Sequence, residues 1–153
     1  MRSEFVSYLK AIGMTDVLVK RIEEVYEFYQ RVSPEEITAI FVTDFLKEDG
    51  NREYENLWFF SQGYVMEAKN FLTKDGFDMT PLLKSSFYWL VEKQDYNFLK
   101  ATEKSRLLIR VNLSAGLGMS GEFKASKENC DYLKDVFHKY LLPNLSAGRG
   151  ATK

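Results

Sequence analysis

Residues 126–141 read S-K-E-N-C-D-Y-L-K-D-V-F-H-K-Y-L and follow a long run of short strand patterns. Ser126 suits the N-cap position of a helix, and Glu128 places a negative charge in the first turn, where the helix dipole favours it. Pro143 limits the helix at its other end. One face of the segment is apolar, with Cys130, Leu133, Phe137, Tyr140 and Leu141. The stretch therefore predicts an amphipathic helix that follows the strands.

Short strands are predicted before this helix, from residue 37 to residue 125. Their predicted ranges are 37–46, 54–61, 64–72, 83–92, 96–101, 106–113 and 119–125. Residues 73–81 are predicted to form a loop. Asp-Gly occurs at 49–50 and 75–76, and Gln-Gly at 62–63, where hairpins need turn residues. The pattern predicts seven strands, mostly in consecutive antiparallel hairpins.

The early and the late strands differ in the distribution of their apolar residues. In residues 107–113 the odd positions are apolar while Arg110 and Asn112 alternate with them, which is typical of a sheet with one wet face. In residues 57–60 and 87–91 both parities are apolar or aromatic. The early strands therefore need cover on both faces.

Two helices are predicted within residues 3–33. The first has three apolar residues on one face, namely Phe5, Leu9 and Ile12. Thr15 is a suitable N-cap for the second, and Ser33-Pro34 ends it. The apolar stripe of the second helix is predicted to be Leu18, Ile22, Val25, Tyr29 and Val32. We expect this helical hairpin to pack over the outer face of the early strands.

Composition and charge narrow the class of protein. The chain has 153 residues, which is typical of one domain, and 15% of them are aromatic, so rings should dominate the core. A formal net charge of −1 argues against nucleic-acid binding and against a polybasic membrane anchor. No apolar run approaches the roughly 18 residues of a transmembrane helix. A soluble cytoplasmic protein is therefore expected.

Three segments together carry a resemblance to a known superfold. They are P-E-E-I-T-A-I-F-V-T-D-F at 34–45, L-W-F-F-S-Q-G-Y-V-M-E at 57–67, and L-L-I-R-V-N-L-S at 107–114 followed by the last helix. This pattern resembles the pleckstrin-homology (PH) superfold, and most of all its bacterial PH-like and GRAM-like forms.

The resemblance implies a mainly β, α+β fold in which a seven-stranded antiparallel sandwich is capped by the C-terminal helix. The implied organisation is an N-terminal helical hairpin at 1–33, a PH-like domain at 34–145 and a flexible tail at 146–153.

In phosphoinositide-binding members of that superfold, a basic cluster surrounds the first hairpin loop. The matching stretch here is K-E-D-G-N-R-E-Y-E at 47–55, in which Lys47 and Arg52 are the only basic residues and four residues are acidic. Carboxylates beside the site would repel a bound phosphate. This argues against specific phosphoinositide binding and leaves Lys47 and Arg52 as the candidate ligand-binding residues.

Other motifs give no catalytic, metal or cofactor site. Residues 116–121 spell G-x-G-x-x-G, but a strand pattern follows where a dinucleotide fingerprint requires a helix. His138 is the single histidine and is interpreted as a surface or half-buried residue. Cys130 is the single cysteine, which excludes an intramolecular disulfide and is interpreted as a small core residue.

These observations favour a non-catalytic PH-like interaction module that binds a protein partner or acts as a scaffold. One alternative is a small ligand-binding protein or enzyme with an aromatic-lined pocket in a cone-shaped α+β fold. That fold normally ends on strands, so the C-terminal helix discriminates between the two. A third hypothesis is self-association through the doubly apolar sheet.

Overall fold

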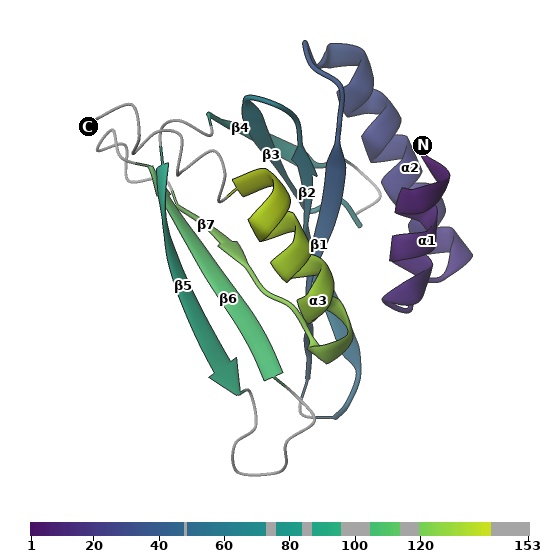
Figure 1. The fold of residues 1–153 in the computed structure, drawn as a ribbon. Coiled ribbons are helices and arrows are strands. Elements are labelled where there is room, and N and C mark those ends of the chain that lie inside the picture. The colour runs from purple at the N-terminus through teal and green to yellow at the C-terminus, as the bar shows by residue number, and fades with distance from the viewer. Residues whose placement is uncertain (48, 73–75, 84–86, 96–104, 114–119, 142–153) are drawn as a thin grey trace, which may run out of the picture.

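The computed structural model describes the chain except for residues 48, 73–75, 84–86, 96–104, 114–119 and 142–153. Two helices come first, α1 (Ser3–Ala11) and α2 (Asp16–Val32), and a third, α3 (Lys127–Val136), follows the strands (Figure 1). The predicted α+β class is confirmed. The predicted domain boundaries remain a prediction, and the tail at 146–153 lies outside the described residues.

The strands form two antiparallel sheets. The first has the order β1-β2-β3-β4, with β1 at Ala39–Leu46, β2 at Arg52–Phe60, β3 at Tyr64–Lys69 and β4 at Asp78–Leu83. The second has the order β5-β6-β7, with β5 at Phe87–Asp95, β6 at Ser105–Leu113 and β7 at Ser120–Phe123. Gly50 adopts a φ of +86° in the turn between β1 and β2, where the Asp-Gly pair predicted a hairpin.

Residues 57–60 of strand β2 are buried on both faces of the sheet because neighbouring residues contact different elements. Trp58 packs its ring 4.1 Å from that of Phe123 on β7, between the two sheets. Phe59 faces the opposite way and stacks on Tyr29 of α2 at 5.2 Å, with Tyr26 edge-on at 6.0 Å. Helix α2 thus contacts the outer face of the first sheet at β2, and aromatic pairs dominate both sides of it.

The second helix buries a face rotated from the predicted stripe. Thr15 caps it as expected, with its hydroxyl accepting from the backbone N–H of Leu18 at 3.4 Å. Val32, predicted to be buried, is 61% exposed, and Leu18 is only partly buried. The rotation follows from Tyr26 and Tyr29, which both pack on Phe59. The buried residues are Val19, Ile22, Val25, Tyr26 and Tyr29.

Strand β4 lies partly inside the segment that was predicted to be a loop, so that prediction is wrong at residues 78–81. Pro81 is unusual in a strand, because proline cannot donate to a sheet ladder. The structure places Pro81 opposite Met66 on an edge strand, where proline is tolerated. The strand predicted at 96–101 lies outside the described residues.

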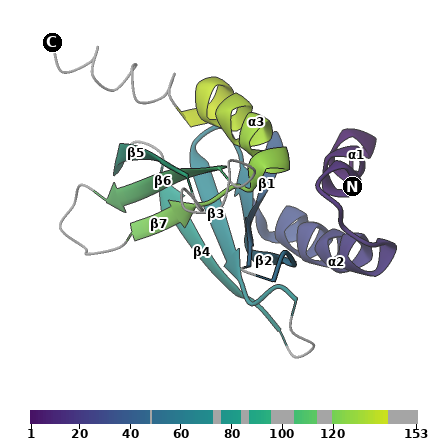
Figure 2. The same cartoon turned by 90° about the horizontal axis from the view of Figure 1, so that it is seen from below.

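The predicted C-terminal helix begins and ends where expected, but its last turn is a π-helix, η2 (Phe137–Leu141). Ser126 occupies the N-cap position. Its hydroxyl does not cap the helix and donates instead to Asp44 on β1 at 2.5 Å. Figure 2 shows α3 and α1 on either side of β1, so two helices distant in sequence flank the same strand.

Candidate binding groove between α1 and α3

The edge of β1 that does not face β2 is covered by other elements over part of its length. Near the hairpin, the backbone N–H of Asp44 donates to the carbonyl of Lys124 at 3.2 Å. One step along the edge, the N–H of Val42 donates to the hydroxyl of Tyr8 at 3.0 Å, and its carbonyl accepts from the side-chain amide of Asn129 at 2.7 Å. Side chains from α1 and α3 therefore substitute for a neighbouring strand at this position.

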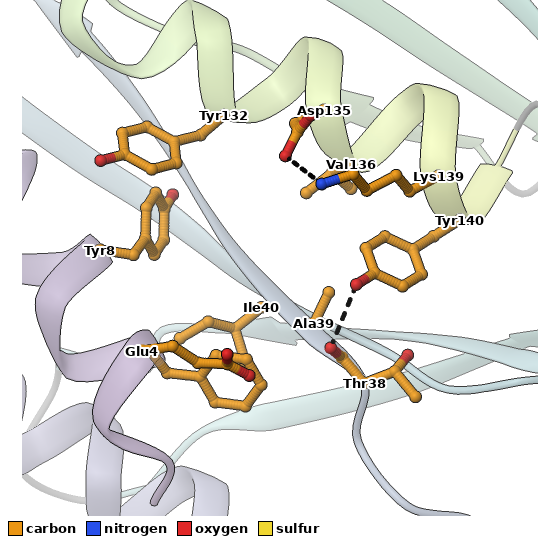
Figure 3. A pocket seen from close by; sticks show the side chains of 11 residues that line it. Glu4, Tyr8, Thr38, Ala39, Ile40, Tyr132, Asp135, Val136, Lys139 and Tyr140 are labelled. Carbon is orange, nitrogen blue, oxygen red and sulfur yellow. Dashed lines mark hydrogen bonds and ion pairs between the residues drawn. The ribbon is translucent and has the colours of Figure 1, made fainter.

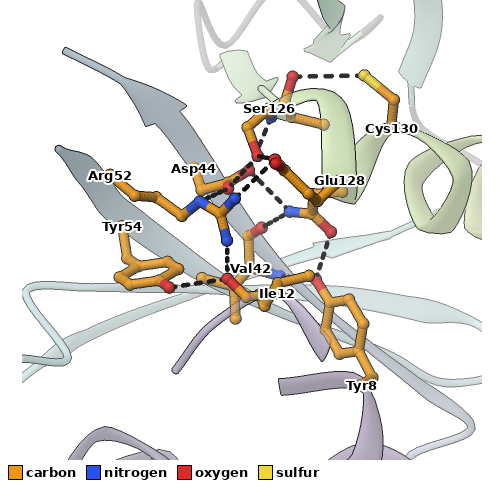
Figure 4. Close-up of polar contacts among 11 residues, drawn as sticks. Tyr8, Ile12, Val42, Asp44, Arg52, Tyr54, Ser126, Glu128 and Cys130 are labelled. Carbon is orange, nitrogen blue, oxygen red and sulfur yellow. Dashed lines mark hydrogen bonds and ion pairs between the residues drawn. The ribbon is translucent and has the colours of Figure 1, made fainter. Parts of the chain in front are cut away.

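Asp44 is the centre of a buried polar cluster that joins β1 to the start of α3 (Figure 4). Its Oδ1 accepts from the backbone N–H of Ser126 and from Nδ2 of Asn129, both at 2.9 Å. Its Oδ2 accepts from the hydroxyl of Ser126. Asn129 also accepts from the Tyr8 hydroxyl at 3.0 Å, which extends the cluster to α1. Each of these donors and acceptors is fixed by a partner, as buried polar groups require.

Arg52, one of the two predicted ligand-binding residues, is part of the same cluster. Its Nη2 lies 2.6 Å from the Glu128 carboxylate, and its Nη1 donates to the carbonyl of Ile12. Its Nε lies 3.3 Å from Oδ2 of Asp44, as an ion pair rather than an aligned hydrogen bond. The guanidinium therefore connects the β1–β2 hairpin to both α1 and α3.

Lys47, the other predicted residue, lies on the same hairpin and contacts a different carboxylate. Its Nζ is 3.4 Å from Glu53, and about half of its side chain is exposed. Ligand binding by Lys47 and Arg52 stays a prediction. The geometry adds a structural role for Arg52 alone.

A groove lies beside the uncovered part of the β1 edge, between α1 and α3 (Figure 3). Its volume is about 210 Å³. Ala39 and Ile40 of β1, together with Thr38 just before the strand, form the floor. Phe5 and Tyr8 of α1 form one wall, and the opposite wall comes from α3 and η2. The second wall includes Tyr132, Val136, Lys139 and Tyr140.

The groove walls are aromatic and their rings are held in place. The Tyr132 ring is edge-on to Tyr8 at 4.6 Å, which closes one end of the groove. Tyr140 stacks on Phe60 at 6.3 Å, and its hydroxyl donates to the carbonyl of Thr38 at 3.5 Å. The π-helical turn places Tyr140 at this position.

The titratable groups of the groove are not arranged as an acid–base pair. Burial raises the pKa of Tyr8 far above its ordinary value, and its hydroxyl already bonds to Asn129 and Val42. Lys139 is paired with Asp135 at 2.8 Å on the exposed face of the helix. The hydrogen bond from Lys139 to Asp135 raises the pKa of the lysine, so the ammonium stays charged.

A second hollow, of about 460 Å³, lies over β2 and β3. Its lining is mostly polar and includes Glu53, Glu55, Asn56 and Lys69. Beside it, Glu67 is almost fully buried and accepts from Asn56 at 3.2 Å. Burial raises the pKa of Glu67. The lining is less apolar than that of most ligand pockets, so the groove is the better binding candidate.

Sequence reasoning missed the residues that organise the groove. Asp44 is the only charged residue of a mostly apolar strand, and Asn129 lies one position before Cys130 on the last helix. A polar residue inside a predicted core strand was a usable signal, because buried polar groups need partners. Tyr8 gave no such signal, since aromatic residues are common in this chain.

Among the described residues, no group of three or more His, Cys, Asp or Glu side chains is placed to hold a metal ion. In the same part of the chain, no helix has both the length and the apolar content to cross a membrane. Comparison with models of protein families, with curated proteins and with solved structures found no match to this chain.

Proposed function

We propose that this chain is a non-catalytic protein-interaction module with a PH-like architecture. The architecture is supported by the grouping of β1–β4 and β5–β7 into two antiparallel sheets, with α3 directly after β7. It is further supported by Phe123 of β7, which packs against both Trp58 and Phe60 of β2.

The observation that carries the binding role is the aromatic groove at the β1 edge. Tyr132 is 37% exposed there, although its ring packs on Tyr8. Aromatic residues that are half exposed beside a hollow are typical of protein interfaces, because they offer a large rigid contact area and a polar tip. The buried cluster around Asp44 holds both walls of the groove in place, as a pre-organised binding surface requires.

Selection from a library of random linear peptides displayed on phage tests the proposal, using the full chain as bait. We expect peptides to be enriched over beads without protein. Their affinity should fall about tenfold or more for Tyr132→Ala, because exposed aromatic residues at interfaces are frequent hot spots.

Val17→Ala is the matched control, since Val17 is 78% exposed on α2, outside the groove. Its affinity for the same peptides should equal that of the wild type. The proposal fails if no peptide is enriched, or if Tyr132→Ala and Val17→Ala bind the selected peptides equally well.

A further inference from the structure

The backbone of Ile40 is the polar feature of the groove floor. In a strand, the N–H and C=O of one residue point to the same edge, and this direction repeats every second residue. Val42 directs both groups away from β2, toward Tyr8 and Asn129. Ile40, two residues earlier and opposite Phe59, therefore directs its N–H and C=O to the same edge.

Backbone groups at the neighbouring positions of this edge have hydrogen-bond partners, and the edge-facing groups of Ile40 differ from them in this respect. Two residues after Ile40, both backbone groups of Val42 form hydrogen bonds with Tyr8 and Asn129. Two residues before Ile40, the carbonyl of Thr38 accepts from the Tyr140 hydroxyl. In the part of the chain that the structure describes, no hydrogen bond outside the β1–β2 ladder involves the backbone of Ile40. A donor and an acceptor thus lie side by side on the floor of the groove, which is the arrangement that an added strand pairs with.

We infer that the groove binds an extended peptide segment, which pairs with the backbone of Ile40 as a short added strand between α1 and α3. This inference rests on the proposed function and specifies its mode of binding. An extended peptide offers a carbonyl and an N–H at the spacing of the two Ile40 groups. Its alternate side chains would point toward the aromatic walls formed by Phe5 and Tyr132.

The groove is large enough for the side chain of one peptide residue, but it is smaller than the usual pocket for a drug-sized molecule. Its volume of about 210 Å³ is below the ~300–1,000 Å³ that is typical of pockets for drug-sized ligands. A peptide can place one large apolar side chain in this space while the rest of the segment continues along the surface.

The charge at the rim indicates which residues should flank that side chain. Arg2 bridges Glu4 and Glu36 at one end, and Lys139 pairs with Asp135 at the other. Three carboxylates and two cations leave the rim with a net charge of −1. The occupant is therefore an extended segment with a large apolar residue next to a lysine or arginine, which complements Glu4 and Glu36.

The test uses peptides selected on the wild-type chain. Hydrogen exchange followed by NMR should show the Ile40 amide slowed at least tenfold by a bound peptide. A scan in which single peptide nitrogens are methylated should show an alternating pattern. Methylation opposite Ile40 should weaken binding about tenfold, since it removes one hydrogen bond and adds a clash, whereas methylation of either neighbour should not.

A charge-reversal pair tests the second part of the inference. Glu4→Lys should weaken binding of a basic peptide several-fold, whereas Glu27→Lys, an exposed control on α2, should leave it unchanged. Peptides that bind in a Tyr132-dependent manner, but leave the Ile40 amide unchanged and give a flat methylation scan, would overturn strand addition while the interaction function stands. Failure to select any peptide would overturn both.

Discussion

At the scale of single residues, Asp44 determines how the polar interior is arranged. It is fully buried, and its two oxygens receive hydrogen bonds from Ser126 and Asn129 and an ion pair from Arg52. Removal of one partner from such a cluster is costly because the remaining charge stays buried. Arg52 and Lys47 therefore differ in role, although the sequence predicted one role for both.

Replacement of Arg52 and of Lys47 in turn tests whether Arg52 alone has a structural role. Arg52→Gln should lower the free energy of unfolding by about 2 kcal/mol, because it leaves the carboxylate of Asp44 without its cation. Lys47→Gln should change it by less than about 0.5 kcal/mol, as for an exposed ion pair. Urea denaturation monitored by tryptophan fluorescence measures both. Equal effects of the two substitutions would contradict the structural role of Arg52.

Glu67 predicts a pH dependence of stability. Burial raises its pKa in the folded state above the ordinary 4.5, so the folded protein holds this proton more tightly than the unfolded chain does. The contribution of Glu67 is therefore most favourable below about pH 4.5 and is lost as the pH rises through the folded-state pKa. Glu67→Gln should remove this loss, so the stability of the variant relative to the wild type should increase as the pH rises from 4.5 through the folded-state pKa.

Denaturation curves at several pH values test this expectation. Glu53→Gln is the control, because Glu53 lies on the neighbouring strand with its side chain about half exposed. A stability difference between Glu67→Gln and the wild type that stays constant with pH would be contrary to the prediction.

At the scale of elements, the β1 edge is protected by side chains instead of by a neighbouring strand. Tyr8 from α1 and Asn129 from α3 satisfy the backbone of Val42, and each also bonds to the other. An unprotected strand edge is a site for unwanted pairing, and helices commonly cover such edges. Here the cover is interrupted at Ile40, where the groove lies.

Loss of the Tyr8 hydroxyl should weaken this cover. Tyr8→Phe leaves the buried N–H of Val42 without an acceptor, so we expect a loss of about 1–3 kcal/mol in the free energy of unfolding. Exchange of the Val42 amide should accelerate as well. Tyr132→Phe is the matched control, because its ring packs on Tyr8 while its hydroxyl makes none of the hydrogen bonds that join Tyr8, Val42 and Asn129. The same loss in both variants would show that the hydroxyl of Tyr8 is not specifically required.

At the scale of the whole molecule, the first sheet is covered on one face by the second sheet and contacts the N-terminal helices with the other. Phe59 shows this directly, since it is fully buried and its ring neighbours are Tyr26 and Tyr29. The helices at 3–32 therefore complete the core, whatever further contacts they make.

Deletion of residues 1–33 should expose the outer face of the sheet. Light scattering should then detect larger oligomers or aggregates than it detects for the full chain, because a large exposed apolar face promotes association. Deletion of residues 146–153, the predicted tail, is the control and should leave the size distribution of the protein unchanged. A monomeric, cooperatively folding 34–153 fragment would show that the helices do not complete the core.

Much of the fold could be predicted because its signals are local. Ser126 at an N-cap, Thr15 at another and Gly50 in a turn act on residues close to them in the sequence. β4 was missed because proline is tolerated in a strand only at a sheet edge, and the sequence does not specify which strands lie at an edge. The buried face of α2 also differs from the predicted stripe, because the orientation of the helix depends on its contacts with Phe59, which is distant in the sequence.

The sequence by itself determined the α+β class, the placement of two helices before the strands and one after them, and the need of residues 57–60 for cover on both faces of the sheet. Hydrophobic period and turn chemistry operate over a few residues, so these features need no knowledge of distant contacts. Only the tertiary structure decided that Arg52 supports Asp44, and that Tyr8 meets Asn129 across 121 residues. It also decided that a groove opens beside Ile40, because a groove exists only where elements distant in sequence approach without filling the space between them.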